Sequence, residues 1–352
     1  MRTELDERDG KIIWQAHLLS GEYLPEKVVG REEQKRKLHM CLSPMKNGQA
    51  PLNAWLYGPA GTGKTALARS LVNEVSTDSA NRFGFYVNCW ERRSLYSVVQ
   101  AIAESMKLLR ADAQDTNVKL DRIRQVIKEK PLVVILDDID RVAPSERERI
   151  IYRILGLPHT GVVCIANKKE TLPSLEERTR SRLGPIVIAF PRYTPEELAE
   201  ILLERAKKGL LANTWKKKDL LQIAQASAGD ARAGVEVLRH AAVAAESTGK
   251  KRIAFRESAE ALRTRVQTRH QEMVSRLSYH ERLIYELALE KQPLLTTDLQ
   301  RIYTSRCLKN GITPVARRTF SKYVKLLGDA GLIRVDERSI GGKGRVVRAA
   351  AT

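Results

Sequence analysis

The sequence predicts an α/β core around a phosphate-binding loop, followed by an all-α segment and a small C-terminal domain. Three observations support this fold class. A glycine-rich loop lies between a strand and a helix near residue 60, strand-forming runs stop after residue 190, and three helices followed by two short strands end the chain. A chain of 352 residues exceeds one typical compact core. We therefore expect a core at 1–190, a helical lid and connector at 191–275, and a winged helix at 276–352.

The charge balance points to a polyanionic partner. The chain has 61 Lys and Arg against 42 Asp and Glu, a formal net charge of +19. Such an excess favours nucleic acid. No run of 18 apolar residues and no basic amphipathic helix is present, so we expect no membrane partner. The charged N-terminus lacks a signal-peptide core, and four scattered cysteines predict neither disulfides nor a zinc site. We expect a cytoplasmic, nucleoid-associated protein.

The glycine-rich loop matches G-x-x-x-x-G-K-[ST] at every fixed position, between an apolar strand at 54–57 and a helix at 66–72. Its glycines let backbone N–H groups turn onto phosphate oxygens, and the helix N-terminus adds partial positive charge. We expect Lys64 to reach the β- and γ-phosphates and Thr65 to hold Mg²⁺. The predicted contacts to ATP or ADP are Gly58, Pro59, Ala60, Gly61, Thr62, Gly63, Lys64, Thr65 and Ala66.

Further strands and helices alternate along the core. Strands are predicted at 83–88, 132–136, 161–166 and 185–190, and helices at 32–42, 94–109 and 118–128. The run at 132–136 is rich in β-branched residues, which suits a strand buried on both faces of a parallel sheet.

That buried run ends in two acids, as in a Walker B element. We expect Asp137 to bind Mg²⁺ and Asp138 to polarise the attacking water. Aspartate draws the carboxylate back by ~1.5 Å relative to glutamate, so we expect slow hydrolysis. Asn167 ends the next strand and is predicted to orient the same water against the γ-phosphate.

Three arginines alternate just before the last core strand, and two of them, Arg178 and Arg182, are candidates for an arginine finger. Such a residue stabilises transition-state charge at a neighbouring subunit's γ-phosphate. A solvated basic face and a contact to DNA phosphate are the alternatives.

The all-α segment begins with Thr194, followed by proline and two acids, a well-formed helix start. Arg232 opens a later helix near 233–244 and could report the γ-phosphate. Upstream of the loop, the extended segment 21–31 either covers the adenine, with Tyr23, Val28 and Val29 as apolar contacts, or is a surface linker.

The order of these motifs resembles the AAA+ ATPases, and more narrowly the archaeal origin-recognition and cell-division-cycle initiators. The resemblance spans nearly the whole chain, and it rests on the loop at 58–65, segments 190–202, 229–232 and 237–239, and the C-terminal winged helix. It implies nucleotide contacts from Tyr193 and Arg205. It also implies assembly with other copies or paralogues and recruitment of the replicative helicase.

This sequence departs from the initiator family at two places. Asp138 stands where a glutamate is usual. The polar stretch 109–118 is also short where the family carries an insertion that contacts DNA, so the resemblance leaves a helical extension there open, and Lys107 and Arg110 could still contact DNA phosphates.

The C-terminal domain is predicted to be a winged helix, with helices at 277–288, 297–308 and 314–330, strands at 331–335 and 345–348, and a basic tip between the strands. From residue 291 onward it has 13 Lys and Arg against 4 Asp and Glu. This favours DNA, mainly through phosphate contacts, over a protein dock. The predicted DNA contacts are Arg317, Arg318, Thr319, Ser321, Lys322, Lys343 and Arg345.

Together these features predict an ATP-dependent initiator of DNA replication, a slow ATPase that binds duplex origin DNA through its winged helix and core. Its ATP or ADP state would control assembly and helicase recruitment. The alternatives are a nucleotide-gated winged-helix transcription regulator and an AAA+ transposition helper or plasmid-partition ATPase.

Overall fold

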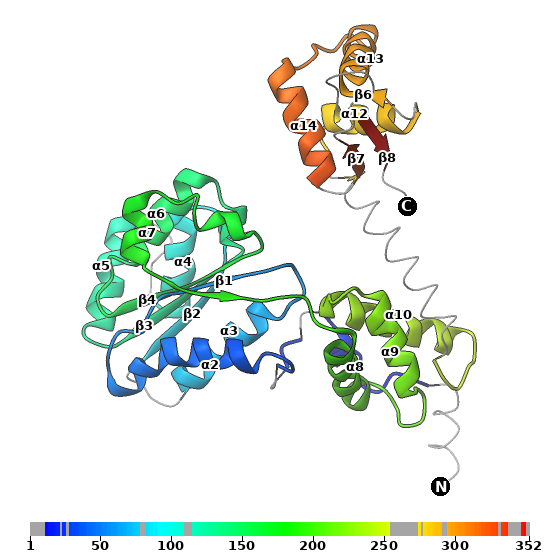
Figure 1. The fold of residues 1–352 in the computed structure, drawn as a ribbon. Coiled ribbons are helices and arrows are strands. Elements are labelled where there is room, and N and C mark those ends of the chain that lie inside the picture. Colours follow the sequence, from blue (N-terminus) through cyan, green and yellow to red (C-terminus); the bar gives the residue numbers. More distant parts are fainter. Residues whose placement is uncertain are drawn as a thin grey trace. The chain divides into compact units, whose positions relative to one another are not determined.

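The computed structural model describes residues 11–21, 23–25, 28–77, 82–108, 115–253, 274–275, 277–290, 294–329, 332–336 and 346–349. The chain divides into two compact units, Met1–Ala259 and Glu260–Thr352, and each is considered by itself (Figure 1). The division falls inside the segment that the sequence assigned to the lid and connector.

A five-stranded parallel sheet forms the core of the first unit. Its order is β2-β3-β4-β1-β5, so the chain crosses over repeatedly between neighbouring strands. Every residue of β3, which lies between β2 and β4, is buried, which explains its β-branched composition. The strands are β1 (Ala54–Tyr57), β2 (Phe83–Asn88), β3 (Leu132–Asp137), β4 (Thr160–Ala166) and β5 (Ile186–Ala189). The predicted α/β class is confirmed.

Helices cover both faces of this sheet (Figure 1). One face packs on α2 (Glu32–Leu42) and α3 (Lys64–Thr77) through a cluster that includes Leu38, Leu67 and Leu71. The other face carries α4 (Leu95–Ser105), α5 (Thr116–Ile127), α6 (Pro144–Ile154) and α7 (Glu177–Leu183). With both faces covered, β3 and β4 are almost entirely buried, while the edge strands β2 and β5 keep partly exposed side chains.

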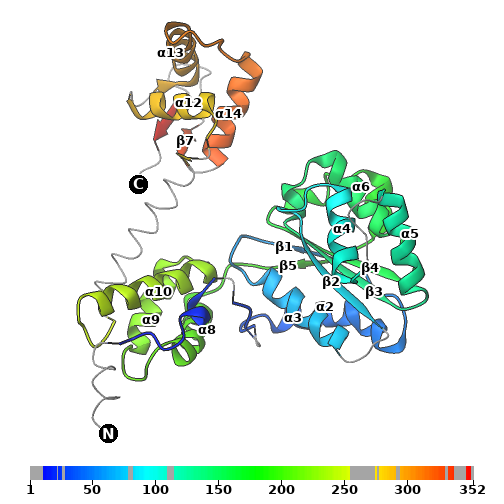
Figure 2. The same cartoon turned by 180° about the vertical axis from the view of Figure 1, so that it is seen from behind.

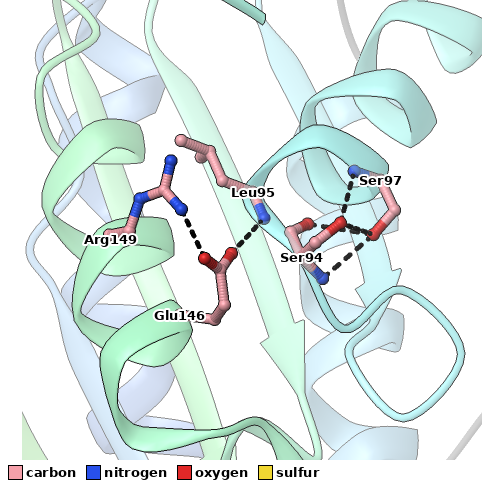
Figure 3. A network of polar contacts seen from close by, with 5 residues as sticks. All are labelled: Ser94, Leu95, Ser97, Glu146 and Arg149. Carbon is pink, nitrogen blue, oxygen red and sulfur yellow. Dashed lines mark hydrogen bonds and ion pairs between the residues drawn. The ribbon is translucent and has the colours of Figure 1, made fainter.

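Helices α4 and α6 are tied together at their first turns (Figure 3). Ser94 and Ser97 form a capping box at the start of α4. Glu146, in the first turn of α6, accepts the backbone N–H of Leu95 at 3.0 Å and pairs with Arg149 at 2.5 Å. An orphan amide of one helix is therefore satisfied by the other helix.

The lid consists of α8 (Pro195–Gly209), α9 (Lys217–Ala226) and α10 (Ala231–Ser247). Thr194 forms the expected N-cap, in a capping box with Glu197. A 3₁₀ turn near the N-terminus, η1 (Ala16–Leu19), packs against α8 and α10 (Figure 2). Glu246 of α10 accepts the backbone N–H groups of Ile12 and Ile13 at 2.6 and 2.7 Å. Residues upstream of the core therefore complete the lid.

The second unit is a winged helix. It contains α12 (Tyr279–Glu290), α13 (Thr296–Lys309) and α14 (Arg317–Asp329), with strands β6 (Leu294–Leu295), β7 (Ile333–Asp336) and β8 (Val346–Ala349) in the order β6-β8-β7. Tyr303 and Phe320 are buried at its centre. The short strand β6 was not predicted. The third helix begins at Arg317 rather than at 314, and in the residues before it the backbone N–H of Val315 donates to the Tyr303 hydroxyl at 3.2 Å.

No helix within the described part of the chain is long and apolar enough to cross a membrane.

Candidate functional site

The glycine-rich loop lies directly under the lid. Gly61 and Gly63 have φ values of +74° and +87°, which favour glycine. A Cβ on Gly61 would lie 1.9 Å from Oδ1 of Asp230, and one on Gly63 would lie 2.5 Å from the Tyr193 hydroxyl. The backbone N–H of Ala231, the first residue of α10, donates to Gly61 O at 3.0 Å. The loop and the start of α10 are thus in contact, and the space beside Gly61 is too small for a side chain.

The ammonium group of Lys64 is buried beneath this loop. It donates to the carbonyls of Gly58 and Pro59, each at 2.7 Å, and to Oδ1 of Asn167 at 3.2 Å. Burial lowers the pKa of Lys64 to about 8, against the attraction of Asp137 and Asp138. A polyphosphate would supply the close negative charge that this buried cation lacks, so the loop fits a nucleotide.

Thr65 and Asp137 converge as the sequence predicts for a metal site. The Thr65 hydroxyl donates to Oδ2 of Asp137 at 2.7 Å, and burial raises the pKa of Asp137. The Tyr86 hydroxyl of β2 donates to the same oxygen at 3.0 Å. A hydroxyl beside a buried carboxylate is an oxygen ligand set that Mg²⁺ accepts. Tyr86 was missed, because an aromatic residue inside a strand carries no sign of this contact.

Asp138 and Asn167 meet at the carboxyl edge of the sheet. The side-chain amide of Asn167 donates to Oδ1 of Asp138 at 2.9 Å, while its oxygen accepts from Lys64. Its backbone N–H donates to Oδ2 of Asp140 at 3.3 Å. Asp138 has a φ of +51°, in the left-handed region. Residues at the ends of β3 and β4 and at the start of α3 therefore form one connected polar group, in the region where open α/β sheets bind ligands.

Two candidate contacts, Arg205 of the lid and Tyr23 of the upstream segment, lie against each other, and a third, Tyr193, lies against Arg31. Arg205 donates to the carbonyls of Leu18 and Tyr23, each at 3.0 Å, and its guanidinium lies 4.5 Å from the Tyr23 ring. Tyr193 is buried, and the guanidinium carbon of Arg31 lies 3.7 Å from the centre of the Tyr193 ring.

Arg31 connects the glycine-rich loop to the start of the lid. It donates to Thr62 O at 2.9 Å and to Pro191 O at 2.7 Å. The sequence interpretation missed Arg31. Val29 is half-buried in a turn, and its neighbour Val28 is the residue near the loop, 3.4 Å from a Cβ placed on Gly63.

Arg232, in the first turn of α10, lies near Lys64 of the glycine-rich loop. A Cβ on Gly21 would lie 3.0 Å from its Cγ, and its charge lowers the pKa of Lys64. The lid thus brings a second cation toward the glycine-rich loop.

Arg178 and Arg182 lie on α7, away from this group. Their guanidinium groups lie 4.7 and 4.5 Å from the ring of Tyr152 on α6. Arg178 also donates to the Tyr152 hydroxyl, and Arg182 to Leu155 O at 3.1 Å. Within the described residues neither arginine hydrogen-bonds to 58–66.

The candidate nucleic-acid surface is the outer face of α14. Arg317, Arg318, Ser321 and Lys322 are exposed and Thr319 is half-buried, while Phe320, Val324 and Leu327 face the core. Helical spacing therefore separates a polar face from a buried one. The other two predicted contacts, Lys343 and Arg345, lie outside the described residues, as does Arg110.

Gly61→Ala is expected to weaken nucleotide binding at least ~10-fold, because a Cβ would meet Asp230 and the left-handed backbone would be strained. Titration with a fluorescent ATP analogue measures this. Gly48→Ala is the matched control, since Gly48 also has a positive φ of +73° but has no atom within 4 Å of a Cβ. Equal losses in the two variants would show that strain alone, and not contact with the lid, is responsible.

Two family descriptions match this chain. Residues 27–165 match "AAA ATPase domain", and residues 272–351 match "CDC6, C terminal winged helix domain". The first covers the loop and the acids that end β3, and the second covers the winged helix.

Full-length relatives match as well. An ORC1-type DNA replication protein 1 of Halobacterium salinarum is 32% identical, over 84% of this chain and 96% of the relative. Another, of Sulfurisphaera tokodaii, is 30% identical over 97% and 90%. Among solved structures, the Aeropyrum pernix ORC1 protein in complex with DNA is similar with a TM-score of 0.83 and 27% identity, over 97% of this chain and 94% of that one.

Proposed function

The chain belongs to the archaeal ORC1/Cdc6-type DNA replication proteins, and from this we propose that it is an ATP-regulated initiator that binds duplex origin DNA. The observation that carries the proposal is the presence in one chain of an AAA ATPase domain and a Cdc6-type winged helix with an exposed basic face on α14. The AAA ATPase domain implies binding and hydrolysis of ATP. The finer assignments below are proposals.

ATP lies between the loop at 58–66 and the lid. Lys64 contacts the β- and γ-phosphates, and Arg232 approaches the γ-phosphate from α10. Tyr193 lies toward the adenine, and Tyr23 and Arg205, which contact each other, complete the base side together with Val29. Thr65 and Asp137 would hold Mg²⁺, which would supply positive charge to offset that of the phosphates.

Hydrolysis depends on Asp138 and Asn167, which orient the attacking water. Because Asn167 also bonds Lys64, it fixes this water relative to the phosphate-binding lysine. Arg178 or Arg182 supplies the finger to a neighbouring copy or paralogue. We expect slow turnover that serves as a switch, since aspartate reaches less far than glutamate.

Asp138→Glu is expected to raise the rate of ATP hydrolysis several-fold, because the longer side chain moves the carboxylate toward the water by ~1.5 Å. Single-turnover hydrolysis by the Mg²⁺-loaded protein measures the rate. Glu129→Asp, which shortens an exposed carboxylate just after α5, is the control. An unchanged rate in the Asp138 variant would show that water positioning there does not limit turnover.

The winged helix binds the DNA. The exposed residues at the start of α14 and Lys343 and Arg345 contact phosphate oxygens, which gives affinity with little sequence choice. The similar Aeropyrum pernix ORC1 protein was solved with DNA bound. Whether ATP or ADP is bound sets the arrangement of the domains. That arrangement determines whether the protein can assemble with other copies and recruit the replicative helicase.

Footprinting of genomic DNA in the presence of ATP and of ADP tests the proposal. Protection of repeats within a replication origin, differing between the two nucleotides, is the expected result. Protection confined to promoters would instead support a nucleotide-gated transcription regulator. Protection that is identical with ATP and with ADP would contradict nucleotide control.

A further inference from the structure

A buried arginine on α6 is the main support of the turn that follows the acidic end of β3. Arg147 is 8% exposed and lies in the second turn of α6. Its guanidinium donates to the carbonyls of Ile139 at 3.1 Å and Val142 at 3.0 Å, with a longer contact to Asp140 O at 3.5 Å. It forms no ion pair with a carboxylate in the described part of the chain, and most of its hydrogen bonds go to backbone carbonyls.

The turn held by Arg147 begins at Asp138. The 3₁₀ turn η3 (Ile139–Arg141) follows directly, and the backbone N–H of Arg141 donates to Asp138 O at 2.9 Å. Asp138 itself has a φ of +51°. A non-glycine residue persists in this conformation where the surrounding structure fixes it. The surroundings here are β3 on one side and the carbonyls bound by Arg147 on the other.

The same turn sets the position of two side chains against Asn167. Oδ1 of Asp138 accepts from the Asn167 side chain, and Oδ2 of Asp140 accepts from its backbone N–H. A shift of the turn therefore moves the Asp138 carboxylate relative to Asn167 and Lys64. Arg147 reaches none of these side chains with a hydrogen bond: it binds the backbone of the turn, and the Asp140 carboxylate adds an electrostatic attraction.

Arg147 also contacts the segment that leads into α7. Its Nη1 donates to Oγ of Ser174 at 3.3 Å, and Ser174 in turn donates to Thr171 O at 2.7 Å. Ser174 lies three residues before the first residue of α7, the helix that carries Arg178 and Arg182. One guanidinium thus joins the acidic turn to the approach of the candidate finger helix.

We propose that Arg147 is a positioning residue for ATP hydrolysis, which fixes the turn at 138–142 against the segment before α7. It touches neither nucleotide nor metal. The inference rests on the proposed role of Asp138 and Asn167 in hydrolysis. The proposal adds a residue that lies outside the nucleotide site. It also means that α6 connects Asp138 to α7, the helix whose Arg178 and Arg182 would act on a neighbouring copy.

The test compares Arg147→Met and Arg147→Lys with Arg149→Met. Arg149 lies one half-turn further along α6, is exposed, and pairs with Glu146 without reaching the turn (Figure 3). Single-turnover hydrolysis and the Kd of a fluorescent ATP analogue are measured for each folded protein. For Arg147→Met we expect a fall in the hydrolysis rate of about 10²-fold, with Kd changed by less than about twofold, because a displaced group loses rate without losing binding.

Arg147→Lys keeps the charge but has a single donor centre, so it should recover part of the rate. Arg149→Met should match the wild type. Combining Arg147→Met with Asp138→Ala should cost little beyond Asp138→Ala alone, since both act on the same group. A merely structural role would lower the melting temperature, or reduce rate and affinity together, and either pattern without a selective loss of rate would overturn the proposal.

Hydrogen exchange gives a readout that does not depend on catalysis. In Arg147→Met, peptides covering 138–142 and 168–174 should exchange faster, while those covering 58–66 should be unchanged. Unaltered exchange at 138–142 would overturn the proposal. If Asp138→Ala leaves hydrolysis intact, the proposed role of Asp138 is wrong, and the exchange result still decides whether Arg147 holds the turn. If Arg147→Met does not fold, Arg147→Lys carries both measurements.

Discussion

Lys64→Met is expected to reduce ATP hydrolysis at least ~10²-fold and to remove the rise in melting temperature that ATP gives the wild-type protein. The ammonium of Lys64 is the buried cation under the glycine-rich loop, and its removal leaves developing phosphate charge without its closest donor. A ligand at 100 times its Kd stabilises a protein by about 2.7 kcal/mol, so the loss is readily seen in a thermal melt.

The pH dependence of nucleotide binding gives a second sign of the same lysine. Burial lowers the pKa of Lys64 to about 8 without nucleotide, whereas a bound polyphosphate favours the charged form. Affinity should therefore fall as the pH rises through about 8. The stability of the nucleotide-free protein has the opposite pH dependence. The buried charge of Lys64 lowers the stability below pH 8, and this cost is relieved as the pH rises from about 8 toward the pKa of lysine in the unfolded chain.

Lys35→Met, an exposed change on α2, is the control for both measurements. A Lys64→Met protein that still melts at a higher temperature with ATP, or a wild-type affinity that is flat between pH 7 and pH 9, would contradict the assignment.

The affinity for duplex DNA is expected to fall ~10³-fold between 50 and 200 mM salt, if ~6 phosphates are neutralised. Replacing Arg317 and Arg318 together by alanine should lower the slope of log K against log salt by about 1.8, since each neutralised phosphate contributes about 0.9. Both side chains are exposed on the first turn of α14, so their loss leaves the buried face of the helix intact.

Fluorescence anisotropy of a labelled duplex, measured across a salt series, provides the slope. Arg306→Ala is the matched control in the same domain, because Arg306 already pairs with Glu290 at 3.1 Å. A slope that stays constant in the α14 double variant would show that the winged helix meets DNA by another face, or serves as a protein dock.

The sequence predicted what depends on short spacing. The glycine-rich loop, the acids that end β3 and the capped start of α8 are set within a few residues, and each lies where it was expected. Asn167 was predicted because parallel strands bring their carboxyl ends to one edge. The family comparisons then confirmed the AAA ATPase core and the winged helix.

The residues that the sequence did not predict have in common that their contacts form only once the chain has folded. Tyr86 meets Asp137 across two strands, Arg31 binds carbonyls 31 and 160 residues away, and Arg147 binds backbone atoms rather than a charged partner. The contacts of Tyr86 and Arg31 depend on strand register and on how the lid packs against the core, and those of Arg147 depend on how the turn after β3 folds back onto α6, so no local sequence pattern predicts them. Strand β6 escaped for another reason: its two residues are too few for an alternating pattern to be visible.

The lid has two covalent connections to the core, because residues 11–20 pack on it before the chain enters the sheet and α8 follows after the chain leaves. Glu246 binds the upstream segment at one end, and Arg205 binds it at the other. A rigid body joined at one point can turn in any direction, whereas one joined at two points turns about the line between them. The lid should therefore swing about a single axis, so that exchange of one nucleotide for another yields one reproducible displacement rather than a spread of orientations.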